Sequence, residues 1–156
     1  MHFSLLYVSE KPNKWVEEAC QSYLKRMPAS FGYTQTRLTP VKRTKNTHIE
    51  TAKEQEWQLI REKIPNHALL VLLDERGKQF TSVTFSQQID RWQHNGQDVV
   101  FVIAGADGVM ATHRKQANTL MALSQLTLPH EMARLFLTEQ LYRGWSILNN
   151  HPYHRI

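Results

Sequence analysis

Two uninterrupted apolar runs constrain the fold of this chain more than any other feature of its sequence. Ala68–Leu73 and Val99–Ile103 contain only aliphatic and aromatic residues, as expected of central strands in a parallel sheet that is covered on both faces. A loop containing Gly77 follows the first run, and a loop containing Gly105 and Gly108 follows the second. Parallel strands need long crossover connections, usually helices. The two runs therefore predict an α/β fold.

Strand and helix patterns alternate along the rest of the chain. His2–Val8 predicts a buried first strand, and Pro12 opens a helix to about Met27 with Trp15, Ala19 and Tyr23 on its inner face. The other expected elements are a strand at Tyr33–Thr39, a helix over about 48–64, a helix capped by Ser82 or Thr84 and ending near His94, a helix over about 110–121, a short strand at Leu123–Leu128 and a final helix from Pro129 to about Leu148. This order predicts a mostly parallel sheet flanked by helices in one domain over residues 1–156.

Composition narrows the cellular context. The single cysteine, Cys20, excludes a disulfide within the chain and suits a reducing compartment. No basic segment precedes the short apolar run Phe3–Val8, so no signal peptide is visible. No stretch approaches the roughly 20 apolar residues that span a bilayer. We expect a cytoplasmic protein that does not bind membranes.

Positive charge is concentrated in two places. The net charge is +5, and one cluster holds Arg37, Lys42, Arg43 and Lys45 with no acidic residue between them. A second begins at His130 and contains the arginines at positions 134, 143 and 155. Such clusters are solvated surface in many proteins, but two of them together with a basic excess also fit contact with RNA or DNA.

The final helix pattern is apolar around more than half of its circumference. The residues that contribute are Met132, Leu135, Phe136, Leu137, Leu141, Tyr142, Trp145, Ile147 and Leu148. A helix on the surface of a protein needs only one apolar stripe. So wide an apolar surface in a short chain predicts that a second subunit covers part of it, and hence a homodimer.

The glycine loop after the second apolar run lacks the usual phosphate-binding fingerprints. Ala104-Gly-Ala-Asp-Gly108 is not G-x-G-x-x-G, and no G-K-[ST] follows it. An adenosyl cofactor without a phosphate tail therefore fits better than NAD or ATP. The pair His151-x-x-His154 is half of a metal site without cysteines nearby, and we expect no metal.

Five ordered motifs resemble those of a known family over essentially the whole chain. They are Leu72-Leu-Asp-x-x-Gly-Lys78, Phe101-Val-Ile-Ala-Gly-x-x-Gly108, Leu123-Ser-x-Leu-Thr-Leu-Pro-His130, Arg134-Leu-x-Leu-x-Glu-Gln-Leu-Tyr-Arg143 and Asn150-His-Pro-Tyr-His-Arg155. With them the sequence resembles the SPOUT superfamily of methyltransferases. Within that superfamily it is most similar to the ribosomal RNA large subunit methyltransferase H family, which methylates N3 of a pseudouridine in 23S rRNA.

This resemblance implies a C-terminal trefoil knot, a homodimer, the ribosome as substrate and S-adenosylmethionine as cofactor. Cofactor contacts are expected from the main chain of three loops, at Leu73, Ala104, Gly105, Leu123, Ser124, Gln125, Leu126, Thr127 and Leu128. The family usually has two glycines where this chain has Ala104-Gly105.

The resemblance also implies catalytic positions, and the two basic clusters supply the RNA-binding candidates. The catalytic candidates are His130, Arg143, Tyr153 and His154, and the RNA-binding candidates are Arg37, Lys42, Arg43, Lys45, Arg134 and Arg155. His130 begins a helix, whose dipole disfavours a cation there and so favours a neutral base. Arg143 is equally suited to a structural ion pair with Glu139, four residues before it. The Tyr153/His154 tail is expected to close over the target nucleotide, and a partner subunit is one source for it.

Two other readings remain open at this point. The first is a non-catalytic RNA-binding dimer that keeps the fold without cofactor affinity, and Ala104 is the residue that supports it. The second is an α/β enzyme with NAD or FMN, which rests on the order of strand, loop and helix alone. Cofactor binding distinguishes these two readings from the methyltransferase, which is expected to bind S-adenosylmethionine rather than a dinucleotide or no cofactor.

Overall fold

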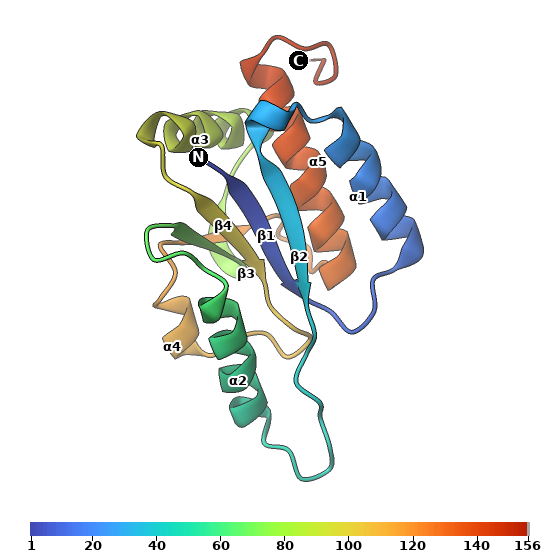
Figure 1. Cartoon of the computed structure of the whole chain (residues 1–156), viewed down its shortest axis with the longest axis vertical. Helices are drawn as coiled ribbons and strands as arrows, with labels where there is room; N and C mark the ends of the chain where they lie inside the picture. The colour runs from blue at the N-terminus through green and yellow to red at the C-terminus, as the bar shows by residue number, and fades with distance from the viewer. Residues whose placement is uncertain (156) are drawn as a thin grey trace.

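The computed structural model describes residues 1–155, which form a five-stranded sheet in the order β2-β1-β4-β3-β5 (Figure 1). All neighbouring strands are parallel. The strands are β1 (Phe3–Val8), β2 (Tyr33–Leu38), β3 (Leu69–Gln79), β4 (Val99–Ile103) and β5 (Thr119–Ala122). The helices are α1 (Lys14–Arg26), η1 (Ala29–Phe31), α2 (Ile49–Glu62), α3 (Ser82–Asn95), α4 (Ala111–Arg114) and α5 (His130–Leu148). The expected parallel α/β architecture is confirmed.

Alternate residues of the central strands build two apolar cores, one on each face of the sheet. In β4, Val99, Phe101 and Ile103 belong to a core that includes side chains of α3 and α5. Val100 and Val102 belong to the other core, which includes side chains of α2. Side chains of a strand point alternately to its two faces, so a strand covered on both faces must be apolar throughout. This explains the unbroken apolar runs in the sequence.

Helix α5 lies on one face of the sheet and packs against both α1 and α3 (Figure 1). Leu137, Leu141 and Tyr142 are buried within the chain, whereas Phe136 is 42% exposed. Neighbours in the same chain therefore cover part of its apolar surface, and Met132, Leu135, Trp145, Ile147 and Leu148 are only half-buried. Among the helices of residues 1–155, none combines the length and the apolar character needed to cross a membrane.

Helix α1 begins and ends close to the expected limits, but its inner face differs. Trp15 is 54% exposed, whereas Val16 and Cys20 are fully buried. A spacing of four residues drifts around a helix with 3.6 residues per turn, so Trp15 lies at the exposed edge of the stripe, whose centre is at Val16 and Cys20. Helix α3 is capped by Thr81 rather than by Ser82 or Thr84, and Thr84 completes the capping box.

The expected helix over 110–121 and the expected strand at Leu123–Leu128 were wrong. Helix α4 stops at Arg114, because Asn118 accepts a hydrogen bond from Leu70 N–H (2.8 Å) and the chain joins the sheet as β5. Residues 123–129 then form a loop in which the Ser124 hydroxyl accepts a bond from Leu126 N–H (2.9 Å), a turn typical of serine.

Strand β5 pairs with two separate parts of β3, and Gly77 makes this possible. Met121 is opposite Leu73 in one part and opposite Lys78 in the other, so the residues between them leave the ladder. A Cβ atom on Gly77 would lie 2.5 Å from the backbone of Leu120 and Met121. Only glycine allows the two backbones to approach this closely.

Gly77→Ala is therefore expected to destabilise the protein by about 3 kcal/mol, because backbone atoms on both sides must move. The matched control is Gly96→Ala at the end of α3. A Cβ there meets nothing within 4 Å, so the cost is only that of a positive φ, about 1 kcal/mol. Urea unfolding of both variants and the wild type measures the difference. Equal losses of unfolding free energy would contradict the close approach at Gly77.

Candidate cofactor and substrate site

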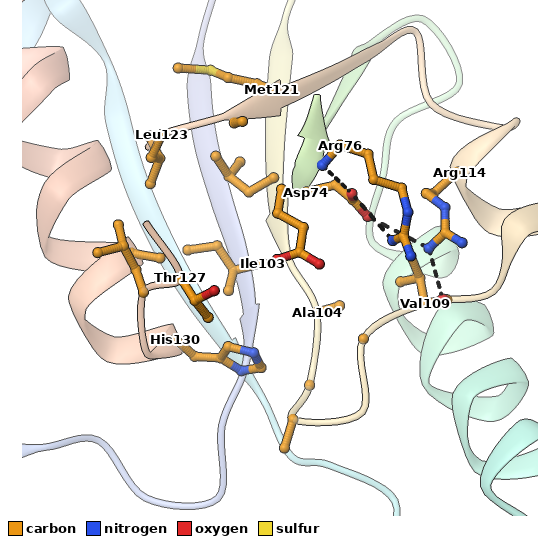
Figure 2. A pocket seen from close by; sticks show the side chains of 18 of the residues that line it. Asp74, Arg76, Ile103, Ala104, Val109, Arg114, Met121, Leu123, Thr127 and His130 are labelled. Atoms are coloured by element: carbon orange, nitrogen blue, oxygen red, sulfur yellow. Dashed lines mark hydrogen bonds and ion pairs between the residues drawn. The ribbon is translucent and has the colours of Figure 1, made fainter. Parts of the chain in front are cut away.

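A cavity lies where the interrupted part of β3 meets the carboxyl ends of β4 and β5 (Figure 2). Its volume is about 530 Å³, which is within the range of small-molecule sites. Its walls are the residues of β3 that leave the ladder after Leu73, the loops that follow β4 and β5, and the start of α5 with His130 and Ala133. Ligand sites of open α/β sheets lie outside the carboxyl ends of strands, and this cavity has that position.

Eight of the nine expected cofactor positions line this cavity. They are Leu73, Ala104, Gly105, Leu123, Ser124, Leu126, Thr127 and Leu128. Gln125 belongs to the same loop but is not among the lining residues. Three separate segments of the sequence thus meet around one space, although the strand expected at Leu123–Leu128 is a loop.

Sequence reasoning missed several charged residues of the cavity. The Asp74 carboxylate is 9% exposed and accepts a hydrogen bond from Arg76 N–H (2.8 Å). It also lies 3.7 Å from the Arg76 guanidinium and 3.6 Å from that of Arg114 (Figure 2). Lys53 reaches the cavity from α2. The Leu72-Leu-Asp-x-x-Gly-Lys78 motif was the only signal for Asp74, and nothing in the sequence pattern indicated Lys53.

His130 is the first residue of α5 and lines the cavity (Figure 2). Burial lowers the pKa of its imidazole below the ordinary value, and the charge of neighbouring Glu131 opposes this shift. The ring is therefore neutral near pH 7, as expected of a base. The physical cause is loss of solvent, whereas the sequence argument relied on the helix dipole.

The other three catalytic candidates lie at the opposite end of α5. Arg143 pairs with Glu139 (2.7 Å), the structural role considered for it above. The Tyr153 hydroxyl donates to the same carboxylate (2.9 Å), and His154 is hydrogen-bonded to Ser146 (2.8 Å). With a rise of 1.5 Å per residue, the helix places about 20 Å between Arg143 and His130. One chain therefore does not bring the four candidates together.

The RNA-binding candidates differ in how they are presented. Lys42, Lys45 and Arg155 are exposed. Arg37 is also exposed, and its guanidinium donates to the carbonyl oxygens of Ser9 and Glu10.

Two arginines of this group are engaged inside the protein. Arg134 is 1% exposed, donates to the Tyr7 hydroxyl (2.6 Å) and pairs with Glu17 (2.8 Å). The expectation that Arg134 contacts RNA was wrong for this chain, because these partners enclose its guanidinium. Arg43 is 29% exposed and pairs with Glu56 and Asp107. Its place in a basic cluster did not reveal these acidic partners.

Comparisons with known proteins agree with this geometry. Residues 1–154 match the family model described as "Predicted SPOUT methyltransferase". A protein of Neisseria meningitidis serogroup A is 46% identical over 155 residues, 99% of each chain, and one of Janthinobacterium sp. is 43% identical over 156 residues, all of each chain. Both relatives carry the name ribosomal RNA large subunit methyltransferase H.

A solved structure has the same fold. It is that of a probable methylase family protein from Haemophilus influenzae, with a TM-score of 0.58 and 9% identity, covering 95% of this chain and 68% of that one. Together with the family model and the curated relatives, this fold is that of a methyltransferase. The chain belongs to the SPOUT methyltransferase family.

The lowered pKa of His130 predicts how stability depends on pH. The unfolded chain takes up a proton on this ring near pH 6.5, whereas the folded chain does so only at lower pH. The free energy of unfolding therefore falls as the pH drops through this window. Urea unfolding at pH 7.5 and 5.5 is expected to show a smaller loss for His130→Gln than for the wild type. An NMR titration of the ring with a pKa at or above its ordinary value would contradict the assignment.

Proposed function

We propose that this protein is an S-adenosylmethionine-dependent methyltransferase that acts on N3 of a pseudouridine in 23S rRNA. The observation that carries the proposal is the cavity formed by the interrupted part of β3 and the loops after β4 and β5, which gathers eight residues of three separate motifs. The names of the relatives support ribosomal RNA as the substrate. The assembled ribosome in the cytoplasm is the proposed setting.

The cavity suits the proposed cofactor. Leu73, Ile103 and Leu128 offer apolar walls for an adenine ring, and the loop at Ala104 and Gly105 offers backbone groups. Bound S-adenosylmethionine supplies a methyl group that its sulfonium centre already activates. The chain's main task is then to hold the nucleophile in line, and such positioning contributes about 7–11 kcal/mol.

His130 is the proposed base at this site. A uracil-type N3 carries a proton that must leave when the nitrogen attacks. The imidazole of His130 lines the cavity and is neutral near pH 7, so it has a free lone pair to accept that proton. Arg143, Tyr153 and His154 are proposed to hold the target nucleotide and to balance charge that develops on its carbonyl oxygens.

The length of α5 requires a second copy of the chain in this arrangement. A tail bound to Glu139 and Ser146 of its own helix lies far from its own His130. The proposed homodimer places the tail of one protomer over the cavity of the other. Exposed apolar side chains at Leu126 in the cavity loop and at Phe136 on α5 fit such an interface.

The proposed rRNA contacts are the exposed cations. They are Arg37, Lys42, Lys45 and Arg155. Contacts of this kind bind phosphate and position the protein without reading bases. The trefoil knot and the single domain over residues 1–156 belong to the same proposal.

Binding of S-adenosylmethionine is the first test. Calorimetry is expected to give a dissociation constant in the micromolar range, and Ala104→Phe is expected to abolish binding because the larger side chain fills the cavity. Methyl transfer to ribosomes that lack the modification should follow the same pattern. A folded wild-type protein without affinity would favour a non-catalytic RNA-binding dimer.

A mixing experiment tests the shared site. Ala104→Phe disables the cavity and Tyr153→Ala disables the tail, so each variant alone is expected to be inactive. After subunits exchange, half of the dimers hold one intact cavity facing one intact tail, and activity should return to about a quarter of the wild type. If cavity and tail of the same chain work together, mixing restores nothing.

A further inference from the structure

We propose that Arg43 and Glu56 are positioning residues that fix the cofactor-binding loop from outside the cavity. This inference rests on the proposed function, because it concerns the affinity of that cavity for S-adenosylmethionine. It gives Arg43 a role other than the RNA contact expected from its place in a basic cluster. It also brings in Glu56, a residue of α2 that is not among those lining the cavity.

Glu56 supports the loop at Gly105. Its carboxylate is 4% exposed, and a Cβ atom on Gly105 would lie 3.0 Å from Glu56 Oε1 and 3.3 Å from Val8 Cγ1. The backbone of the loop thus rests directly on this carboxylate and on the end of β1. Any shift of Glu56 changes the surface against which Gly105 is placed.

Arg43 joins that buried carboxylate to the far side of the same loop. Its Nη2 lies 3.1 Å from Glu56 Oε1 and 2.9 Å from Asp107 Oδ2, and its Nη1 contacts Glu56 Oε2. Asp107 lines the cavity. The guanidinium therefore holds the cofactor loop at Asp107 and, through Glu56, at Gly105.

Every nitrogen of the Arg43 guanidinium is in use within the protein. Nε donates to Asp107 (3.1 Å), and Nη1 also donates to the Val41 carbonyl oxygen (2.6 Å). Val41 N–H donates in turn to Glu56 Oε2 (2.8 Å). A phosphate would have to displace these bonds, whereas Lys42 and Lys45 beside Arg43 are exposed. Within this basic segment, Arg43 thus contacts the cofactor-binding loop, whereas Lys42 and Lys45 face solvent.

Holding the loop matters because ordering a backbone costs free energy. Each residue that becomes fixed on binding costs about 1–2 kcal/mol in conformational entropy. A loop already fixed in the free protein does not incur that cost when the cofactor binds. Loosening the contacts of Arg43 is therefore expected to weaken cofactor affinity.

The test compares affinities for S-adenosylmethionine in variants that stay folded. Removing one partner would leave a buried charge alone and risk unfolding, so the main variant is the double replacement Arg43→Met with Glu56→Gln. A second variant, Asp107→Asn, keeps the buried pair and weakens only the outer contact. The matched control is Thr47→Val, which removes a hydrogen bond from Thr44 N–H (2.9 Å) in the same segment without touching the network.

Calorimetry with S-adenosylmethionine is expected to give an about tenfold higher dissociation constant for the double variant, which corresponds to about 1.4 kcal/mol. Asp107→Asn should give a smaller rise and Thr47→Val none. In methyl transfer to ribosomes, the KM for the cofactor should rise in the double variant while kcat stays close to the wild type, since no group that touches the reacting atoms has changed. Thermal unfolding checks that each variant is folded.

The outcomes separate this inference from the function on which it rests. Wild-type protein without affinity overturns the proposed function itself. Wild-type affinity in the folded double variant overturns the role of Arg43 and Glu56 alone, as does an equal loss in Thr47→Val. If the double variant does not fold, Asp107→Asn decides, and an unchanged dissociation constant in that variant overturns the inference.

Discussion

The pairing of β5 with two separate parts of β3 is the constraint on which the cavity depends. Because β5 meets Leu73 and then Lys78, the residues between them leave the ladder and carry Asp74 and Arg76 to the cavity. The same pairing ends β5 at Ala122, so the next loop starts beside the first. The third wall, after β4, follows from the position of β4 next to β3. Gly77 lets the backbones of β3 and β5 come this close, so the two walls that these strands supply depend on it.

The sequence predicted the strands whose burial on both faces of the sheet gives them a continuous apolar pattern. β4 and the apolar start of β3 were visible as unbroken runs, since strands buried on both faces must be apolar at every position. The short α4 and β5 were not visible. Their limits depend on the bond between Asn118 and Leu70, 48 residues apart, and on pairing with β3. No local periodicity carries that information, and the loop at 123–128 has enough apolar residues to imitate a strand.

The parts of the site that lie at strand ends or within recognisable motifs could be predicted from the sequence. Residues at the ends of parallel strands share one edge of the sheet, so most of the expected cofactor positions line the cavity. Charge patterns were a poorer guide, because a charge in the sequence does not show which partner it meets. Arg134 meets Tyr7 and Glu17 across more than 100 residues, and Arg43 meets Glu56 and Asp107. Lys53 and Glu56 were missed because they belong to a helix with no recognisable motif.

Helix α5 gives the proposed shared site a physical reason. A helix of 19 residues is a rigid rod of about 28 Å, so it keeps His130 and the tail apart within one chain. The tail is not loose, since Tyr153 and His154 are hydrogen-bonded to Glu139 and Ser146. In the proposed dimer, a tail already ordered on its own helix would reach the second protomer without the entropy cost of closing a flexible segment over the substrate. A two-fold arrangement then gives both cavities a tail without adding residues to the chain. In the proposed dimer, the length of α5 that keeps His130 away from the tail of its own chain is thus the reason that the tail of a second protomer is needed.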